Sequence, residues 1–197
     1  VTDLPIAPAN KKIRYTATAK VEPKKTDVFG TNIESNEWDE TTGEGVITFD
    51  GEVTTIGEHA FAGCTSLTSI TIPNSVIEIG EHAFDSCTSL TSVTIPNSVA
   101  TIERAAFQDC SSLQEFNGKF ASEDGRCLII DGVLKAFAPA DVTEYIISNS
   151  VTSIGYGAFE GCSSLTEFKG KFASTDSRCL IVNNSLKAFA PANLTEY

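Results

Sequence analysis

The stretch Leu67-Thr68-Ser69-Ile70-Thr71-Ile72-Pro73 decides the fold of this chain, because its pattern returns at a fixed interval. Counterparts begin at Leu90 and Leu113, each 23 residues further on, and another begins at Leu165. The two isoleucines alternate with Ser and Thr, which is the period of a half-buried strand. The proline ends that strand because it cannot donate to a sheet ladder. A period of roughly 20–30 residues predicts a solenoid in which each repeat forms one coil.

A second, longer unit repeats 52 residues apart. Phe116–Ser122 recurs as Phe168–Ser174, and Lys135–Ala140 recurs as Lys187–Ala192. Because 52 is the sum of 23 and 29, the chain is predicted to contain coils of 23 and of 29 residues. The central strand residues of successive coils are then Ile47, Ile70, Val93, Phe116, Tyr145 and Phe168, and a seventh strand would start at Tyr197.

Each short coil supplies a set of inward-pointing side chains. After the strand and its proline, Val76 and Ile79 point inward along an extended segment, and Gly80–Asp85 is predicted to form a short helical turn that buries Phe84. Stacked strands lie about 4.8 Å apart, so equivalent side chains of successive coils should touch. We expect ladders of Phe61, Phe84 and Phe107, of Cys64, Cys87 and Cys110, and of Ile56, Ile79 and Ile102.

The 29-residue coils replace this helical turn. In Cys127–Phe137 the dipeptide Asp131-Gly132 separates two apolar runs, which is the strongest short hairpin signal. The counterpart Cys179–Phe189 carries Asn183-Asn184, which tolerates the left-handed conformations that such a turn needs. We predict a β-hairpin on the convex side of each longer coil.

The predicted fold is a leucine-rich-repeat solenoid, a right-handed, β-rich α/β superhelix with a parallel concave sheet and with short helical turns and β-hairpins on the convex side. Residues 44–197 would form six coils and break off at the seventh. Residues 1–43 lack the repeat, although Ile13–Ala19 alternates like a strand. Because solenoids need a terminal cap with a polar outer face, we predict a lead-in and β cap here. An independent ligand-binding module is the alternative.

Composition narrows the class of protein. The apolar fraction is 41%, and no apolar run approaches the ~18 residues of a membrane span. The net charge of −12 argues against a nucleic-acid partner, since phosphate binding needs clustered Lys and Arg. The chain has no signal peptide and no methionine, which indicates a processed form or a fragment and favours a secreted or surface location.

The six cysteines fall at repeat positions whose neighbours are core residues. No C-x-x-C motif occurs, so neither a zinc site nor a redox motif is predicted. We expect buried, reduced thiols, since free cysteine behaves as a small hydrophobe. Disulfides between stacked cysteines are the alternative. The six are Cys64, Cys87, Cys110, Cys127, Cys162 and Cys179.

The two histidines, His59 and His82, occupy equivalent positions beside Glu58 and Glu81. Stacked about 5 Å apart, they could hold a metal ion, but a polar convex ridge is the simpler interpretation. The third coil puts Arg104 in that place, which would repel a cation. We therefore predict no metal and no cofactor.

The repeat resembles that of BspA-type leucine-rich repeat proteins. Their pattern L-x-x-I-x-I-P-x-x-V-x-x-I-G-x-x-A-F-x-x-C is spelled here by Leu67, Ile70, Ile72, Pro73, Val76, Ile79, Gly80, Ala83, Phe84 and Cys87. The likeness covers about residues 44–197, with Ser148 and Glu103 as departures. It implies a bacterial or protist surface or secreted protein, linked to adhesion to matrix proteins and cells. The family's repeat carries no catalytic residues.

The concave face is where solenoids usually bind, so its outward residues form the candidate site. From the first coils to the last, these residues change from Ser and Thr to a row of glutamates, called here the glutamate file. A cation or a basic partner would relieve the mutual repulsion of these glutamates. Solvated glutamates, partly screened by Lys119, Lys169 and Lys171, are the simpler alternative. The candidate residues are Ser69, Thr71, Ser92, Thr94, Glu115, Asn117, Glu144, Ile146, Glu167 and Lys169.

Three classes of function are compatible with the sequence. We predict a non-enzymatic binding or adhesion module with a protein or glycan ligand, located at the cell surface or secreted. A structural spacer within a larger surface protein is the alternative. An enzyme is disfavoured, because no Ser/His/Asp order or phosphate-binding loop stands outside the repeat. An open last coil would also expose unpaired strand groups, so we expect further coils or self-association through that end.

Overall fold

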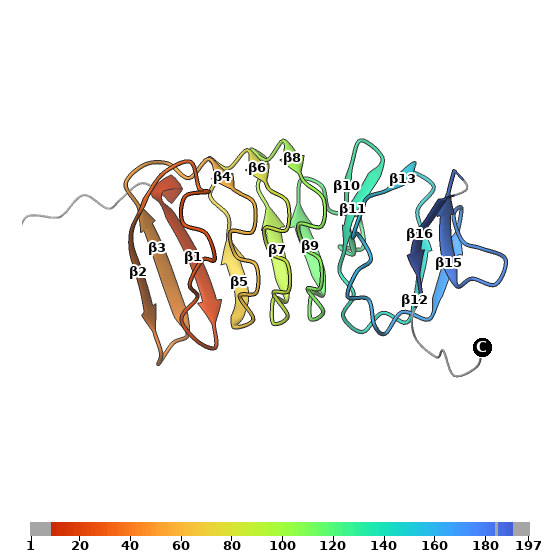
Figure 1. Ribbon diagram of the computed structural model, residues 1–197, viewed down its shortest axis with the longest axis horizontal. Coiled ribbons are helices and arrows are strands. Elements are labelled where there is room, and N and C mark those ends of the chain that lie inside the picture. Colours follow the sequence, from red (N-terminus) through yellow and green to blue (C-terminus); the bar gives the residue numbers. More distant parts are fainter. Residues whose placement is uncertain (1–8, 184, 191–197) are drawn as a thin grey trace, which may run out of the picture.

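The computed structural model describes residues 9–183 and 185–190 and shows an elongated stack of short strands (Figure 1). The largest sheet, called here the main sheet, has six strands in the order β2-β3-β1-β5-β7-β9. Their bounds are β1 (Lys12–Ala17), β2 (Ile33–Asp39), β3 (Glu44–Phe49), β5 (Leu67–Thr71), β7 (Ser92–Ile95) and β9 (Glu115–Gly118). A second sheet, in which all strands are parallel, is formed by β4 (Thr55–Ile56), β6 (Glu78–Ile79) and β8 (Thr101–Ile102).

The C-terminal part of the chain forms three smaller sheets instead of continuing these two. The first consists of β10 (Cys127–Ile130), β11 (Val133–Phe137) and β13 (Ser153–Ile154). The second pairs β12 (Glu144–Ile147) with β14 (Glu167–Gly170). The third pairs β15 (Cys179–Val182) with β16 (Ser185–Phe189).

The predicted solenoid is confirmed, but with about five turns in place of the predicted six coils. The strands of these turns are β5, β7, β9, β12 and β14. The strand around Ile47 does not stack on the strand around Ile70, because β1 lies between them and pairs antiparallel with both. The N-terminal segment thus supplies a central strand of the main sheet. Its role as a cap, and the division of the chain at residue 43, remain proposals.

The predicted helical turns on the convex side are wrong. The described residues contain no α-helix, only a three-residue 3-10 helix at Ala9–Lys11. In each short coil a left-handed residue (His59, His82 and Ala105, with φ of 58°, 53° and 52°) breaks helical geometry at the same place. Alternate amides then donate to the next coil, as Phe61 does to the carbonyl of Ala83 at 2.8 Å. The amides between them close turns within their own coil, as Ala62 does to the carbonyl of His59 at 3.2 Å, so the bonds alternate between coils and turns and form no helix.

The ladders of the short coils are confirmed. The rings of Phe61 and Phe84 stack at 5.5 Å, and those of Phe84 and Phe107 stack at 5.2 Å with an interplanar angle of 5°. Ile56, Ile79 and Ile102 pair in register across β4, β6 and β8 and are fully buried. Each buried aromatic or aliphatic side chain stabilises the stack by about 2–3 kcal/mol.

The predicted hairpins are also confirmed, and the first carries the turn that its sequence indicates. Asp131 and Gly132 both have positive φ, at 49° and 77°, between β10 and β11. β11 pairs in parallel with β13 of the next coil. The second hairpin is β15–β16, with Asn183 left-handed at its turn; Asn184 lies outside the described residues, as does Tyr197, where a seventh strand was expected.

Candidate binding face

The outer face of the main sheet is the face that the sequence predicts to be concave. Ser69, Ser92 and Glu115 align across β5, β7 and β9, and so do Thr71, Thr94 and Asn117. All six side chains are exposed or half-buried, while Ile70, Val93 and Phe116, which lie between them on the three strands, are buried. This half of the predicted site is one continuous surface.

The other half of the predicted site lies on a separate sheet. Glu144 aligns with Glu167, and Ile146 aligns with Lys169, across the parallel pair β12–β14. β12 does not pair with β9, so the expected single file of glutamates is broken between Glu115 and Glu144.

A loop of the first long coil, Ser122–Gly125, accounts for the break. The amide of Phe116 in β9 donates to the carbonyl of Gly125 at 2.7 Å, which uses the donor that a following strand would need. On its other side the loop is held by Tyr145 of β12, whose hydroxyl donates to Asp124 Oδ2 at 2.9 Å. Burial and its bonds to Cys127 and Asp124 raise the pKa of Tyr145. The loop therefore occupies the place between the two strands.

The glutamates beyond the break are partly neutralised. Lys169 Nζ lies 2.6 Å from Glu144 Oε2 and 3.8 Å from Glu167 Oε2. The hydrogen bond to Glu144 raises the pKa of Lys169. Lys119 and Lys171, also expected to screen the file, instead lie over the rings of Phe120 and Phe172. Glu115 accepts a hydrogen bond from Asn117 at 3.1 Å.

Two basic residues on this face were missed by the sequence analysis. Lys12 and Arg14 lie on β1, and Arg14 aligns with Thr71 of β5 on one side and Val46 of β3 on the other. The repeat pattern could not reveal them, because the segment before residue 44 has no counterpart in the coils. The only signal was the alternation that predicts a strand there.

A hollow of about 540 Å³ lies beside these basic residues at the ends of β5 and β7. A second hollow of about 280 Å³ adjoins it and shares Arg14 and Thr71. Residues around the larger hollow are Asn10, Lys12, Arg14, Ile70, Thr71, Ile72, Pro73, Asn74, Thr94 and Pro96.

The histidine pair forms a stacked polar ridge. The rings of His59 and His82 lie 5.1 Å apart and nearly parallel, as expected. Arg104 takes the place of the neighbouring glutamate, not of a histidine, and pairs with Glu81. The position equivalent to the histidines is Ala105. Among the described residues no group of three or more His, Cys, Asp and Glu side chains could hold a metal ion.

The cysteines are free thiols, buried in five cases and half-buried at Cys179. Cys87 and Cys110 donate through sulfur to the carbonyls of Phe61 and Phe84, each at 3.1 Å, so the thiols link successive coils. Burial raises the pKa of Cys64 to about 11 and that of Cys110 to about 12. Cys64 and Cys110 therefore pack between coils, where burial disfavours the thiolate form.

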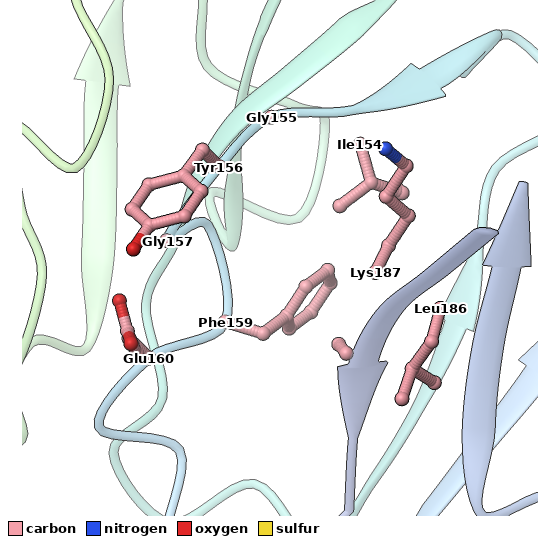
Figure 2. A pocket seen from close by; sticks show the side chains of 9 residues that line it. Ile154, Gly155, Tyr156, Gly157, Phe159, Glu160, Leu186 and Lys187 are labelled. Carbon is pink, nitrogen blue, oxygen red and sulfur yellow. The ribbon is translucent and has the colours of Figure 1, made fainter.

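A third hollow, of about 370 Å³, lies at the other end of the stack between the turn after β13 and the second hairpin (Figure 2). Its walls include Ile154, Phe159 and Leu186. The equivalents of these three residues, 52 positions earlier in the sequence, are Ile102, Phe107 and Leu134. They line the place that is filled by the turn after β13. There the amide of Gly155 donates to the carbonyl of Leu134 at 2.8 Å. The hollow thus corresponds to the place of one coil turn.

No helix among the described residues is both long and apolar enough to cross a membrane. No curated protein sequence matches the chain. Among solved structures, the chain is similar to the leucine-rich repeat protein TpLRR of T. pallidum, with 26% identity and a TM-score of 0.44 over 75% of this chain and 71% of that one.

Two further solved structures are similar. A leucine-rich repeat protein of Bacteroides ovatus has 34% identity and a TM-score of 0.43, and the match covers 61% of this chain and 29% of that one. A leucine-rich cell surface protein of Faecalibacterium prausnitzii has 26% identity and a TM-score of 0.34, over 68% and 46% of the two chains. The sequence model of the family described as BspA type leucine rich repeat region matches this chain in six copies. The matches cover residues 31–122 and 134–196, which is more than half of the chain. The protein therefore belongs to the BspA-type leucine-rich repeat family.

Proposed function

We propose that the protein is a non-enzymatic binding module, secreted or at a bacterial cell surface, that holds a protein or glycan partner against the outer face of the main sheet. The observation that carries this proposal is the aligned Ser and Thr residues of β5 and β7, which together with Glu115 and Asn117 of β9 leave a continuous surface of polar side chains. Members of this family are typically non-catalytic repeat proteins. Solenoids use such extended faces for binding.

The contact surface follows from the break in the sheet. The N-terminal half, with Ser69, Thr71, Ser92 and Thr94, offers hydroxyls beside the basic β1 strand. The C-terminal half, with Glu144 and Glu167, is already paired to Lys169. We therefore place the partner mainly on the N-terminal half, with Glu115 and Asn117 at its border.

A matched pair of substitutions tests this proposal. Thr94→Arg puts a long charged side chain in the middle of the outer face. Thr101→Arg puts the same side chain at the exposed residue of β8 in the other sheet. Both proteins should be screened against immobilised matrix proteins and glycans. We expect Thr94→Arg to weaken binding of any captured ligand at least tenfold and Thr101→Arg to leave it unchanged. Equal effects would contradict the proposed face, and a chain that binds nothing would favour the spacer function.

Self-association through the C-terminal end is a separate part of the proposal. Leu186 is 63% exposed and lines the hollow of Figure 2, so this end presents apolar surface next to strand β16. We expect sedimentation velocity to show concentration-dependent dimers that Leu186→Lys abolishes. A wild-type monomer at millimolar concentration would overturn this part.

A further inference from the structure

We propose that Lys12 and Arg14 form a subsite for carboxylate side chains, so that the partner bound on the outer face is an acidic protein segment. The inference rests on the proposed function and names the chemistry of its partner. Both residues lie on β1, the strand that the repeat pattern does not include.

The insertion of β1 places these two basic side chains inside the binding face. Lys12 and Arg14 are two residues apart on one strand, so both point to the same side of the sheet. Arg14 aligns with Thr71, and Thr94 aligns with Thr71 on the next strand. Two cations and two hydroxyl donors therefore lie on the same side of three neighbouring strands.

Both cations are available to a ligand. Among the described residues neither the Lys12 nor the Arg14 side chain makes an ion pair or a hydrogen bond within the chain. Some other basic residues are engaged: Lys11 donates to the carbonyl of Asp50 at 2.7 Å, and Arg104 pairs with Glu81. The chain as a whole has a net charge of −12, whereas the larger hollow is lined by these two unpaired cations.

The larger hollow fits a carboxylate on a peptide. It contains both cations, and no carboxylate is among its lining residues, whereas Glu44 lines the smaller hollow beyond Arg14. Arg presents a planar fork that matches a carboxylate in a bidentate way. Asn74 and the two threonines add neutral donors, and Pro73 and Pro96 supply an apolar wall.

The lining favours a peptide over a sugar. No aromatic side chain lines this hollow, so it has no flat ring on which a pyranose could stack. The apolar wall of prolines and isoleucines suits the aliphatic stem of a glutamate or a neighbouring apolar residue. The overall negative charge of the protein would repel an acidic partner elsewhere, which restricts its approach to this subsite.

The test uses a fluorescein-labelled decapeptide of alternating glutamate and glycine, with the glutamine–glycine peptide as neutral reference. Binding is measured by fluorescence anisotropy at low and at physiological salt. The double variant Lys12→Thr/Arg14→Thr keeps residues suited to a strand and removes both charges. We expect it to weaken binding of the acidic peptide about tenfold or more and to lower the salt dependence of binding.

A charge-matched control separates a site from general attraction. Lys24→Thr/Lys135→Thr removes two positive charges from positions outside the main sheet and should change affinity less than twofold. Equal loss in both double variants, or no binding of the glutamate peptide by the wild type at 1 mM, would overturn the subsite. Binding of a carboxylated oligosaccharide in place of the peptide, lost in the same variant, would overturn the peptide form in favour of an acidic glycan.

Failure of the subsite can be told apart from failure of the proposed function. If Thr94→Arg blocks a matrix ligand but Lys12→Thr/Arg14→Thr does not, the face binds but the acidic subsite is wrong. If the acidic peptide binds as expected while Thr94→Arg leaves every matrix ligand unaffected, the subsite stands and the proposed face for the matrix partner is wrong.

Discussion

The two long coils carry nearly the same sequence, yet equivalent residues differ sharply in burial. Leu134 of the first hairpin is 0% exposed, whereas Leu186, 52 residues later, is 63% exposed. The difference is the neighbour: Leu134 pairs with Ile154 of the following coil, and Leu186 borders the hollow of Figure 2. Burial in this protein is thus decided by the next coil as much as by the repeat itself, as expected of a linear array.

The largest loss of stability is expected in the 23-residue coils that carry Phe61, Phe84 and Phe107. Phe84→Ala removes the middle ring of a stack that is closed on both sides, so unfolding free energy should fall by about 3–5 kcal/mol. Ile77→Ala in the same coil, with a side chain 55% exposed, should cost about 0.5 kcal/mol or less. Urea melts that show a similar small loss for both would mean that the ring stack does not hold the coils.

The comparison of the two leucines can be measured directly. Leu134→Ala should lower the unfolding free energy by about 2–5 kcal/mol, because it leaves a cavity under a packed neighbour. Leu186→Ala should change it by about 0.5 kcal/mol or less, since the side chain is already in solvent. Equal costs, measured by denaturant unfolding, would contradict the difference in burial.

Adding a coil sharpens this comparison. Tyr197 is the counterpart of Tyr145, so a copy of residues 146–170 joined after Tyr197 continues the 52-residue repeat. In the extended chain, Leu186→Ala should cost about as much as Leu134→Ala does now, because a new turn covers it. A control extension with Ser at the positions copied from Ile154 and Phe159 should leave the substitution nearly neutral. No difference between the two extensions would mean that the hollow does not accept a coil turn.

Alkaline pH should weaken the short coils through their thiols. Burial raises the folded-state pKa of Cys64 to about 11 and of Cys110 to about 12, against about 8.5 in an unfolded chain. The unfolded state loses these protons first, so stability is complete below about pH 8.5 and declines as pH rises towards 11–12. The urea midpoint should fall between pH 8 and 10.5, and less steeply in Cys110→Ala. Identical slopes would show that this thiol does not contribute.

The smallest effect concerns the glutamates on either side of the break. Glu115→Lys changes a charge at the border of the proposed contact surface and should alter affinity for a captured ligand about two- to fivefold, mostly through the association rate. Glu144→Lys/Glu167→Lys lies beyond the loop and should have no effect on affinity. Surface plasmon resonance with both variants checks this order, and a larger effect of the second variant would move the site to the β12–β14 sheet.

The sequence was sufficient to predict which side chains stack from coil to coil. The Phe, Ile and Cys ladders and both hairpins follow from spacing, because residues one coil apart must meet in a stack. Two features did not follow. A left-handed conformation is uncommon for residues other than glycine, so the turns at His59, His82 and Ala105 were mistaken for helical ones. The position of β1 depends on long-range strand pairing, which no local pattern encodes.

The candidate site was predicted in part for the same reason. Rows of Ser and Thr across equal coils were placed correctly, because register is fixed by the hydrophobic period. The glutamate file failed at the 29-residue coil, where six additional residues allow Ser122–Gly125 to fold back against its own strand. Lys12 and Arg14 were missed because they lie outside the repeat.

The break between β9 and β12 confines the proposed binding face to the N-terminal half. Scalar couplings across hydrogen bonds, recorded by NMR on deuterated, ¹⁵N,¹³C-labelled protein, report which carbonyl each amide contacts. We expect a coupling between the Phe116 amide and the carbonyl carbon of Gly125. A coupling from the Phe116 amide to a carbonyl of Glu144–Ile147 would show a continuous sheet and would contradict the account.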